Sequence, residues 1–476
     1  MSAPTTSQVR PFAAVPVGVT AGVVGLVHLV AAVIYPGRYF DEALMLSLGR
    51  NHLDWGSADQ PPLTPAIAAL ADAVAPDSLV ALRIVPVLAT TASVLVTALI
   101  ARELGGGRRA QTLAAIAAGT GIWTSGLGHV LVPGALEPVG WLTLSWLLAR
   151  WVRVRDDRLL LAIGPVLGLA ALTKFQVIGL GAVLLVALAV AGPRSVLRRP
   201  ALWGGVVVGA VIAAPTLLWQ AAHGWPQMQM AGVVAEESET FGGRPMNAAL
   251  LLLGAGVLGV VLTVAGVVGA ARDPRLRPYR FLALTGVVLW VVFAVAPGRM
   301  YYLAGYYGVL AALGAVAFQH RREDGHARLS WMAWPGVVLA VVAAGATLPE
   351  MASSAPPELP EQIAASVDRA SATLSPEQRS RAVVVTADYT AAAYLDVERS
   401  RPELPPVYSV HRAYGYLDPP PDDRDVVLFL GEDPAVLAPA VTGLQRVDSD
   451  DEYPVWVGTG PHRPWSQAWP SLRTLR

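Results

Sequence analysis

The sequence predicts an α-helical polytopic membrane protein of about eleven spans, with a small C-terminal α/β domain outside the membrane. Of its 476 residues, 54% are hydrophobic and only 15% are charged, a composition outside the usual range of soluble domains. Runs of eighteen or more residues almost free of charge recur through the first 350 positions, and each is long enough to cross a bilayer. Buried helices of a soluble protein seldom stay uncharged over such lengths.

The expected spans are the apolar stretches between charged residues or Pro/Gly breaks. They lie near residues 12–34, 79–101, 110–128, 134–150, 159–173, 175–192, 201–219, 246–270, 281–296, 301–319 and 331–348. The first stretch follows one arginine and has no small-residue cleavage site. We therefore expect it to be a retained span rather than a signal peptide.

Basic residues are distributed unevenly among the loops. If the N-terminus is cytoplasmic, the inner loops hold Arg102, Arg108, Arg109, Arg150, Arg153, Arg155, Arg158, Arg194, Arg198, Arg199, Arg272, Arg275, Arg277, Arg280, Arg321, Arg322 and Arg328. The outer loops hold only Arg38, Arg50, Lys174, Arg244 and Arg299. The positive-inside rule then favours a multi-pass membrane protein with a cytoplasmic N-terminus and an extracytoplasmic C-terminal domain.

The same rule predicts a hairpin at residues 159–192. A single tilted span would place the arginine clusters at 150–158 and 194–199 on opposite sides of the membrane. A hairpin keeps both clusters inside and puts its tip, Thr173-Lys174-Phe175, at the outer face.

The chain changes in composition after residue 348. Residues 349–360 are rich in Pro, Ala and Ser, which is typical of a linker. Short apolar runs at Ala382–Thr386, Val426–Leu430 and Tyr453–Val457 then predict strands, and a helix is expected at 360–372. We therefore expect a membrane domain at 1–348, the linker, and an extracytoplasmic α/β domain at 361–476, a sufficient length for a small domain.

The first outer loop, residues 35–78, is longer than a connection needs. Its segment Asp41–Trp55 has apolar residues at helical spacing, which predicts an amphipathic helix lying in the membrane interface. Asp41 and Glu42 stand at the start of this helix. One interpretation is a helix cap, because an acid there satisfies free backbone amides. A catalytic role is compatible with a cap.

Further ionisable residues are expected at the same face. Glu137 lies a few residues inside the fourth span, where a charge is costly and marks either a functional site or an interfacial side chain. Lys174 is the only lysine of the chain. Arg83 and Arg299 supply further cations, and Tyr301 and Tyr302 follow the second of them.

Several classes of site are absent from the sequence. It has no cysteine, which excludes disulfides, thiolate metal sites and cysteine nucleophiles. It has no Walker sequence, no dinucleotide fingerprint and no G-x-S-x-G elbow. Its net charge of zero gives no indication of nucleic-acid binding. A divalent metal requirement stays open, although the spacing of His129, His223 and Glu137 matches no metal motif.

Outer carboxylates together with outer cations suggest transfer from an anionic lipid donor. A carboxylate could act as general base on an incoming hydroxyl, and Arg or Lys could balance the charge on a phosphate leaving group. A transporter whose buried charges line a pathway fits these residue types equally well.

Three runs in the first outer loop carry a resemblance to a known family: Tyr39–Glu42, Leu48–Gly56 and Asp59–Pro65. They closely resemble bacterial proteins of the dolichyl-phosphate-mannose-protein mannosyltransferase-like family, which are GT-C membrane glycosyltransferases related to the aminoarabinose transferase of lipid A. The likeness continues through Gly168–Phe175, Pro215–Gln220, His223–Pro226, Arg299–Leu303, Val407–His411, Pro464-Trp465 and Trp469-Pro470. It covers nearly the whole chain.

The resemblance implies a transferase of the plasma (inner) membrane that passes a sugar (a hexose or pentose) from a polyprenyl-phosphate donor to an extracytoplasmic acceptor hydroxyl on a lipid, a protein or a wall polymer. It implies that Asp41 is the general base of an inverting displacement and that Glu42 supports it. Lys174, Arg299 and Arg83 become candidates for binding the donor phosphate, with Tyr301 and Tyr302 as hydrogen-bond donors.

The sequence departs from the family at one point. The second outer acid is commonly Asp, whereas the nearest match here is Glu137. Two alternatives also stay open: a transporter or flippase of lipid-linked sugars, and an inactive relative that serves as an envelope scaffold. The absence of an inverted repeat disfavours the first, and the intact Asp41-Glu42 pair disfavours the second.

Overall fold

The computed structural model describes residues 10–240, 242–296, 298–326, 331, 333–398, 401, 403–447 and 452–476. Arg328, one of the expected inner-loop arginines, lies outside them. The chain forms two compact units. The helical unit comprises Met1–Tyr35, Val80–Pro215 and Val234–Ala352, and the sheet unit comprises Pro36–Leu79, Thr216–Val233 and Ser353–Arg476. The first outer loop and the C-terminal residues therefore belong to one unit.

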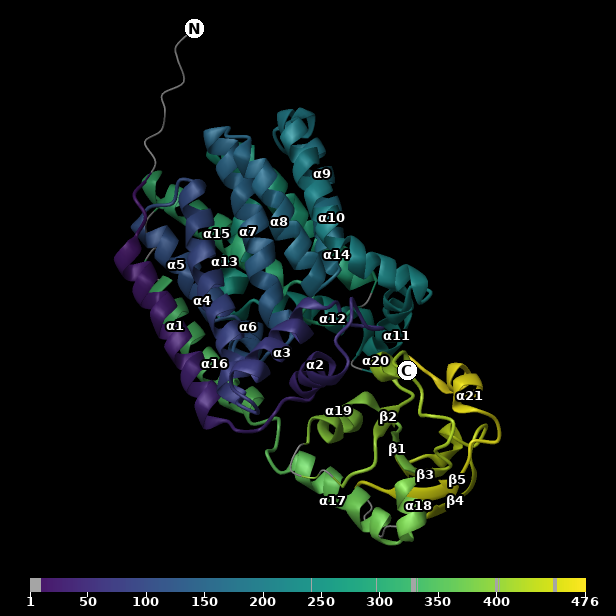
Figure 1. The fold of residues 1–476 in the computed structure, drawn as a ribbon. Coiled ribbons are helices and arrows are strands. Elements are labelled where there is room, and N and C mark those ends of the chain that lie inside the picture. Colours follow the sequence, from purple (N-terminus) through teal and green to yellow (C-terminus); the bar gives the residue numbers. More distant parts are fainter. Residues whose placement is uncertain are drawn as a thin grey trace. The chain divides into compact units, whose positions relative to one another are not determined.

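The helical unit is a bundle whose longer helices lie roughly alongside one another (Figure 1). Its elements are α1 (Ala14–Ile34), α4 (Leu79–Glu103), α5 (Arg108–Gly119), α6 (Ile122–Leu127), α7 (Pro133–Val154), α8 (Arg158–Thr173), α9 (Gln176–Ala191), η1 (Arg194–Arg198), α12 (Gly243–Leu253), α13 (Gly256–Arg272), η2 (Pro274–Tyr279), α14 (Arg280–Val295), η3 (Ala304–Tyr306), α15 (Tyr307–Glu323) and α16 (Ala333–Ala352). α10 (Pro200–Ala222) and α11 (Pro226–Thr240) each have residues in both units.

Five of the described helical segments are long and apolar enough to cross a bilayer: α1, α4, α10, η2 with α14, and α16. A sixth results if α12 and α13, which meet at 95°, form one broken span. The expected count of eleven spans is therefore not confirmed. Some expected spans are short or broken, because the stretch 110–128 divides into α5 and α6, and α8 and α9 have 16 residues each.

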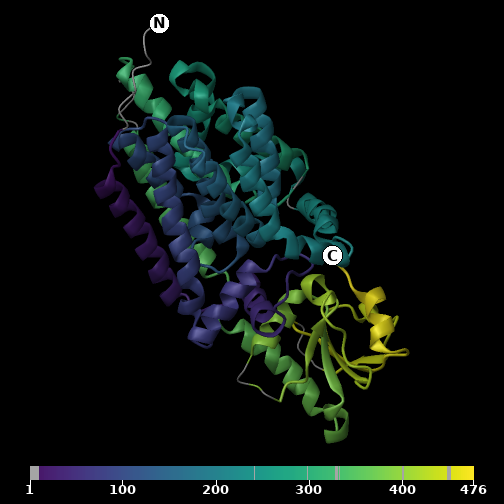
Figure 2. The same ribbon diagram turned by 45° about the horizontal axis from the view of Figure 1, so that its top comes forward.

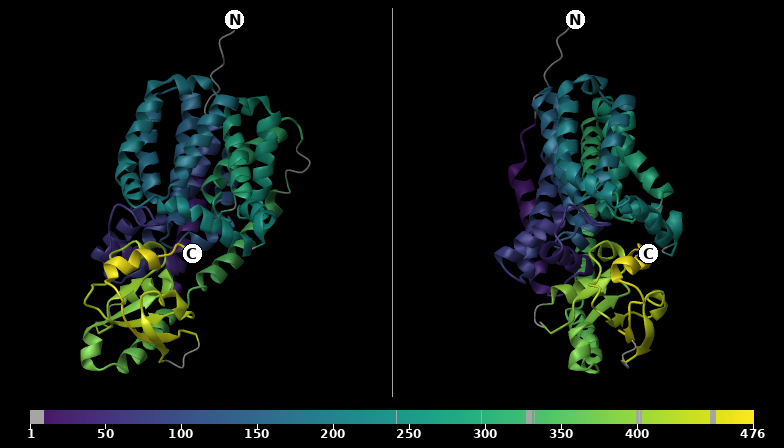
Figure 3. Two further views of the ribbon diagram at one scale, coloured as in Figure 1. Left: turned by 90° about the vertical axis from the view of Figure 1, so that its right-hand side faces the viewer. Right: turned by 45° about the vertical axis from the view of Figure 1, so that its right-hand side comes forward.

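The stretch 159–192 is two helices rather than one. α8 ends at Thr173, Lys174 adopts an extended conformation, and α9 begins at Gln176. The break therefore falls at the Thr173-Lys174-Phe175 tip that the arginine distribution predicts. Helices α8 to α10, coloured blue to teal, lie side by side in Figure 3.

Small residues let neighbouring helices of this unit approach closely. A Cβ atom at Gly314 of α15 would lie 1.9 Å from the carbonyl oxygen of Leu262 in α13. A Cβ atom at Gly205 of α10 would lie 2.3 Å from the carbonyl oxygen of Leu160 in α8. In a lipid environment such close backbone packing replaces the hydrophobic effect as the main source of helix association.

The sheet unit contains a five-stranded mixed sheet with the order β2-β1-β3-β5-β4. The strands are β1 (Ala382–Thr386), β2 (Val407–Ser409), β3 (Val426–Leu430), β4 (Thr442–Arg446) and β5 (Val455–Thr459). β1 pairs in parallel with β2 and β3, whereas β5 is antiparallel to β3 and β4. The predicted strands coincide with β1 and β3, β5 begins two residues later than predicted, and β2 and β4 are additional.

Helices cover both faces of this sheet, which explains why β1 and β3 are buried at every position. Val383, Val385 and Phe429 pack in a core with Trp465 and Trp469 of α21 (Trp465–Leu472). α17 (Leu359–Ala372) contacts β3 and β5, and α19 (Tyr389–Val397) contacts β1 and β2. In Figure 2 the strands lie between the green α17 and the yellow α21. The unit also contains α18 (Pro376–Ser380), α20 (Arg412–Gly415) and η5 (Pro434–Val436).

The first outer loop forms two helices, α2 (Phe40–Asn51) and α3 (Leu63–Val74). α2 packs against α3 and against α19 of the C-terminal region, and every residue from Glu42 to Gly49 is buried. The prediction of an amphipathic helix lying in the membrane interface is therefore wrong for α2. Its polar residues face protein partners, which sequence periodicity could not reveal.

Candidate active site

The acidic pair lies in the first turn of α2, and Tyr39 rather than Asp41 occupies the N-cap position. The cap interpretation of Asp41 is therefore corrected. Both carboxylates still lie where the positive end of the helix dipole stabilises negative charge. Their surroundings differ, because Glu42 is fully buried whereas Asp41 is partly exposed.

A tyrosine from the C-terminal region holds Asp41. The Tyr389 hydroxyl, in the first turn of α19, donates a hydrogen bond of 3.0 Å to Asp41 Oδ1. The guanidinium of Arg412 lies over the Tyr389 ring, 5.2 Å from its centroid, and the ring of His411 is 5.5 Å away, centroid to centroid. Burial, reinforced by the Asp41 charge, raises the pKa of Tyr389, so this phenol remains a proton donor at neutral pH.

A second carboxylate, Asp59, belongs to the same cluster. Its Oδ1 atom is buried without a hydrogen-bond partner, and its Oδ2 accepts a hydrogen bond of 3.3 Å from Gln60. Burial raises the pKa of Asp59, and the nearby Arg412 charge opposes that shift. Asp41 and Asp59 thus surround one tyrosine and one arginine of the C-terminal region.

Glu42 has a separate electrostatic partner. Burial lowers the pKa of Arg38, and the nearby Glu42 carboxylate opposes the shift. Because Glu42 is fully buried and Arg38 is partly buried, each charge offsets part of the desolvation of the other. This arrangement fits the supporting role that the resemblance gives to Glu42.

A hydrogen-bonded seam, defined here as Ser47, His52, Asp396 and Tyr414, joins α2 to the C-terminal region. Asp396 Oδ2 accepts hydrogen bonds from Ser47 Oγ at 2.5 Å and from the Tyr414 hydroxyl at 3.2 Å, and it lies 3.2 Å from His52 Nε2. Burial alone would raise the pKa of Asp396, but the hydrogen bonds from His52 and Ser47 outweigh it and lower the pKa.

Arg50, at the other end of α2, extends this attachment. Its guanidinium pairs with both carboxylate oxygens of Asp72, at 2.6 and 2.9 Å, and donates to the carbonyl of Val397 at 3.0 Å. α2 is therefore fixed to α3 and to the end of α19.

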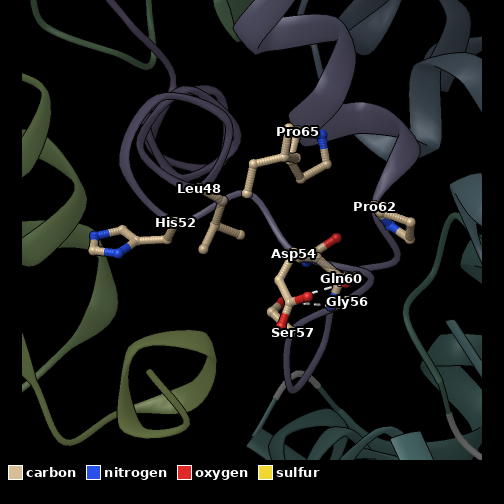
Figure 4. A pocket seen from close by; sticks show the side chains of 9 residues that line it. Leu48, His52, Asp54, Gly56, Ser57, Gln60, Pro62 and Pro65 are labelled. Atoms are coloured by element: carbon tan, nitrogen blue, oxygen red, sulfur yellow. Dashed lines mark hydrogen bonds between the residues drawn. The ribbon is translucent and has the colours of Figure 1, made fainter. Parts of the chain in front are cut away.

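A shallow recess opens beside the end of α2 (Figure 4). Its polar lining comes from His52, Asp54, Ser57 and Gln60, and a hydrogen bond of 2.9 Å joins Ser57 N to the carbonyl of Gln60. Trp219 Nε1 donates to Asp54 Oδ2 at 2.7 Å and so orients that lining residue. The recess is smaller than typical ligand pockets.

The helical unit contains the second cluster, around Lys174. Lys174 Nζ lies 3.6 Å from Glu137 Oε2 and 4.8 Å from the ring centroids of both Tyr301 and Tyr302. Glu137 is 3% exposed, and its Oε1 atom is buried without a hydrogen-bond partner. The two aromatic faces and the carboxylate together stabilise the ammonium group.

The two predicted arginines of this unit have other partners. Arg299 forms an ion pair with Glu237. Arg83 is buried, and its Nη1 donates a hydrogen bond of 2.6 Å to the carbonyl of Tyr35, at the C-terminal end of α1. That contact satisfies a carbonyl that the helix leaves without a partner.

His129 and His223, whose spacing with Glu137 matches no metal motif, lie in different environments. His129 Nδ1 lies 3.3 Å from His28 Nδ1 in a buried stacked pair, and the His223 ring stacks on Trp219 with centroids 3.9 Å apart. Within the described residues, no group of three or more His, Asp or Glu side chains is arranged to hold a metal ion.

The structure thus brings the predicted residues together in two sets. Glu137, Lys174, Tyr301 and Tyr302 meet in the helical unit, and the Asp41-Glu42 pair lies in the sheet unit.

Sequence reasoning did not identify Tyr389, Asp59 or Arg412. Asp59 stands within the matching run of the first outer loop, which was a usable signal. Arg412 follows the matching run that ends at His411. Its backbone φ of 48° is unusual for a residue other than glycine.

Comparisons with known proteins agree with the motifs. The family model described as "Dolichyl-phosphate-mannose-protein mannosyltransferase" matches residues 59–219. This match includes Glu137 and Lys174 but begins after Asp41. Curated protein sequences give no match.

Several solved structures share the fold. ArnT from Cupriavidus metallidurans bound to undecaprenyl phosphate is 17% identical with a TM-score of 0.56, covering 97% of this chain and 99% of that one. The apo state of the same protein is 16% identical with a TM-score of 0.59, over the same shares of the two chains. The Archaeoglobus fulgidus oligosaccharyltransferase in complex with Zn and sulfate is 13% identical with a TM-score of 0.53, covering 79% of this chain and 61% of that one. The chain therefore has the GT-C fold, and the resemblance drawn from its motifs is confirmed.

The seam predicts a stability effect that depends on pH. Asp396→Ala should destabilise the detergent-solubilised protein by roughly 2–3 kcal/mol, because hydrogen bonds to a charged acceptor are lost and buried donors remain. Since the folded-state pKa of Asp396 is lowered, its contribution is present above the ordinary carboxyl pKa of about 3.9 and disappears as the pH falls below that value.

Thermal melting at pH 7 and pH 3 checks this expectation. The melting temperature of Asp396→Ala should lie below that of the parent at pH 7, and the difference should shrink at pH 3. Asp418→Ala, at an exposed position of the same unit, serves as the control. Equal melting temperatures for Asp396→Ala and the parent at pH 7 would contradict the seam.

Proposed function

We propose that this chain is a membrane glycosyltransferase that moves a sugar from a polyprenyl-phosphate donor to an extracytoplasmic acceptor hydroxyl. The observation that carries the proposal is the Asp41 carboxylate, in the first turn of α2, with the Tyr389 hydroxyl 3.0 Å from Oδ1. The GT-C fold and the family match at residues 59–219 support it. One of the structures that share this fold, ArnT from Cupriavidus metallidurans, is bound to undecaprenyl phosphate.

In the proposed reaction Asp41 accepts the proton of the acceptor hydroxyl as its oxygen attacks the anomeric carbon. The bond from that carbon to the donor phosphate breaks on the opposite side, so the configuration inverts. Asp41 suits the task because an ionised carboxylate near the surface can reach an incoming hydroxyl. Glu42 is fully buried near Arg38 and acts as its supporting neighbour.

Lys174 is the leading candidate for the donor phosphate. Its ammonium group is already held by Glu137, Tyr301 and Tyr302, and a phosphate could take the place of the glutamate as its anionic partner. Tyr301 and Tyr302 would hydrogen-bond the same group. Arg299 would have to exchange its pairing with Glu237 for the phosphate. Arg83, which is engaged at the end of α1, is the weaker candidate.

The proposed location is the plasma (inner) membrane, with a cytoplasmic N-terminus and the C-terminal residues outside. The apolar helices and the arginine distribution support this orientation. It would place the sheet unit on the side where an extracytoplasmic acceptor is available.

A flippase or transporter of lipid-linked sugars is the second candidate. The ion pair of Lys174 with the buried Glu137 in the helical unit favours it, because charges within a membrane protein often mark a transport pathway. The hydrogen-bonded carboxylate of Asp41 favours the transferase.

Replacing the general base tests the function. Asp41→Asn should abolish sugar transfer, a loss of at least about 100-fold, because the amide cannot accept the proton in the transition state. Transfer is measured with purified protein, lipid-linked donor extracted from the native membrane, and the acceptor fraction. Asp418→Asn makes the same chemical change at an exposed site and should transfer normally. Normal transfer by Asp41→Asn in a folded protein would sink the assignment.

Single cysteines test the orientation, since the native chain has none. Ser195 and Ser354 are both exposed. With a membrane-impermeant maleimide on intact cells, the Ser354→Cys variant should be labelled, whereas the Ser195→Cys variant should react only after the membrane is opened. The opposite pattern would overturn the proposed topology.

A further inference from the structure

We infer that the C-terminal region completes the acid–base site, and that Tyr389 is the positioning residue that orients the Asp41 carboxylate. The inference rests on the proposed function of Asp41. It extends that function by giving α19 of the C-terminal region a direct part in sugar transfer.

Hydrogen bonds attach α19 to the segment that carries Asp41. Tyr389 bonds Asp41 itself, the Tyr394 hydroxyl donates to the carbonyl of Arg38 at 2.9 Å, and Asp396 accepts from Ser47. These contacts lie before, within and after the first turn of α2. The backbone of Asp41 is therefore fixed by α19 on both sides of the carboxylate.

Tyr389 is itself held rigidly. Asp388 is the N-cap of α19, and its side chain accepts hydrogen bonds from the amides of Thr390 and Ala391. The amide of Tyr389 donates to His411 Nδ1 at 3.3 Å. Arg412 covers the face of the tyrosine ring. Because the Tyr389 hydroxyl is already held in place, it orients the Asp41 carboxylate with little further loss of side-chain entropy.

The hydrogen bond from Tyr389 to Asp41 also has a chemical effect. A hydroxyl that donates to one carboxylate oxygen fixes the plane of the carboxylate and favours its ionised form. Both effects help a general base, since it must face the acceptor hydroxyl and be deprotonated before the reaction. Burial and the Asp41 charge raise the pKa of Tyr389. The phenol therefore keeps its own proton and cannot itself act as the base.

Removal of one hydroxyl tests this role. Tyr389→Phe should lower kcat about 10- to 100-fold, the equivalent of one hydrogen bond to a charged group, with little change in KM for the lipid donor. The acid limb of the pH–rate profile should also move to higher pH, because a carboxylate that loses its donor holds a proton more tightly.

Tyr394→Phe is the matched control. It removes the same group from the same helix, but its lost bond is to the backbone of Arg38 rather than to Asp41, so the acid limb should stay in place. Incorporation of 3-fluorotyrosine at position 389 keeps the packing and strengthens the donor. It should therefore retain activity and move the acid limb to lower pH, which separates positioning from folding.

The outcomes separate this inference from the function on which it rests. Normal transfer by Asp41→Asn would remove the proposed function itself. Loss of transfer in Asp41→Asn, together with a parent-like kcat and acid limb in Tyr389→Phe, would overturn only the role of Tyr389. Equal shifts of the acid limb in Tyr389→Phe and Tyr394→Phe would likewise overturn it, because the effect would then be merely structural.

Discussion

The attachment of α2 to α19 is the constraint on which the candidate site depends. α2 is a twelve-residue helix, too short to be stable by itself in water, and its charged and polar residues face the protein. The Asp396 carboxylate, mostly buried, satisfies donors from Ser47 and Tyr414 and lies beside His52. Because a buried charge without partners is costly, α2 cannot slide along α19 without losing several of these bonds together.

This constraint explains how a partly exposed aspartate can be oriented for chemistry. Surface carboxylates usually sample several rotamers, whereas Asp41 has its backbone fixed by the helix and one oxygen fixed by Tyr389. The helical unit shows the complementary arrangement, since Lys174 is held by a carboxylate and two aromatic rings. Each cluster thus holds one charged group in a fixed environment: the proposed base in the sheet unit and the proposed phosphate ligand in the helical unit.

Sequence reasoning predicted the parts of the fold that depend on local pattern. β1 and β3 coincide with the predicted strands, because strands buried on both faces are continuous apolar runs. The helix break at Lys174 followed from the charges on either side of it. β4 was missed because four of its five residues are exposed, so it lacks an apolar pattern. The environment of α2 was missed because α19 lies more than 300 positions away in the sequence.

In the site, too, features of local sequence could be predicted, whereas contacts between distant segments could not. Asp41 could be identified from the sequence because it stands at a predicted helix start, and Lys174 because it is the only lysine of the chain. The Tyr389–Asp41 contact could not be predicted, because no spacing rule links residues 41 and 389. The pairing of Lys174 with Glu137 joins the break between α8 and α9 to α7, so the second acid stands beside the proposed phosphate ligand.

The proposed reaction breaks the bond between a sugar and its lipid phosphate. The most direct measurement reconstitutes the purified protein in liposomes that contain the lipid-linked donor and an acceptor, and follows both the free polyprenyl phosphate and the sidedness of the intact donor. A transferase should release polyprenyl phosphate only when acceptor is present, with the sugar joined to the acceptor in inverted configuration. Movement of intact donor across the bilayer, without release of polyprenyl phosphate in the presence of acceptor, would contradict the proposed reaction.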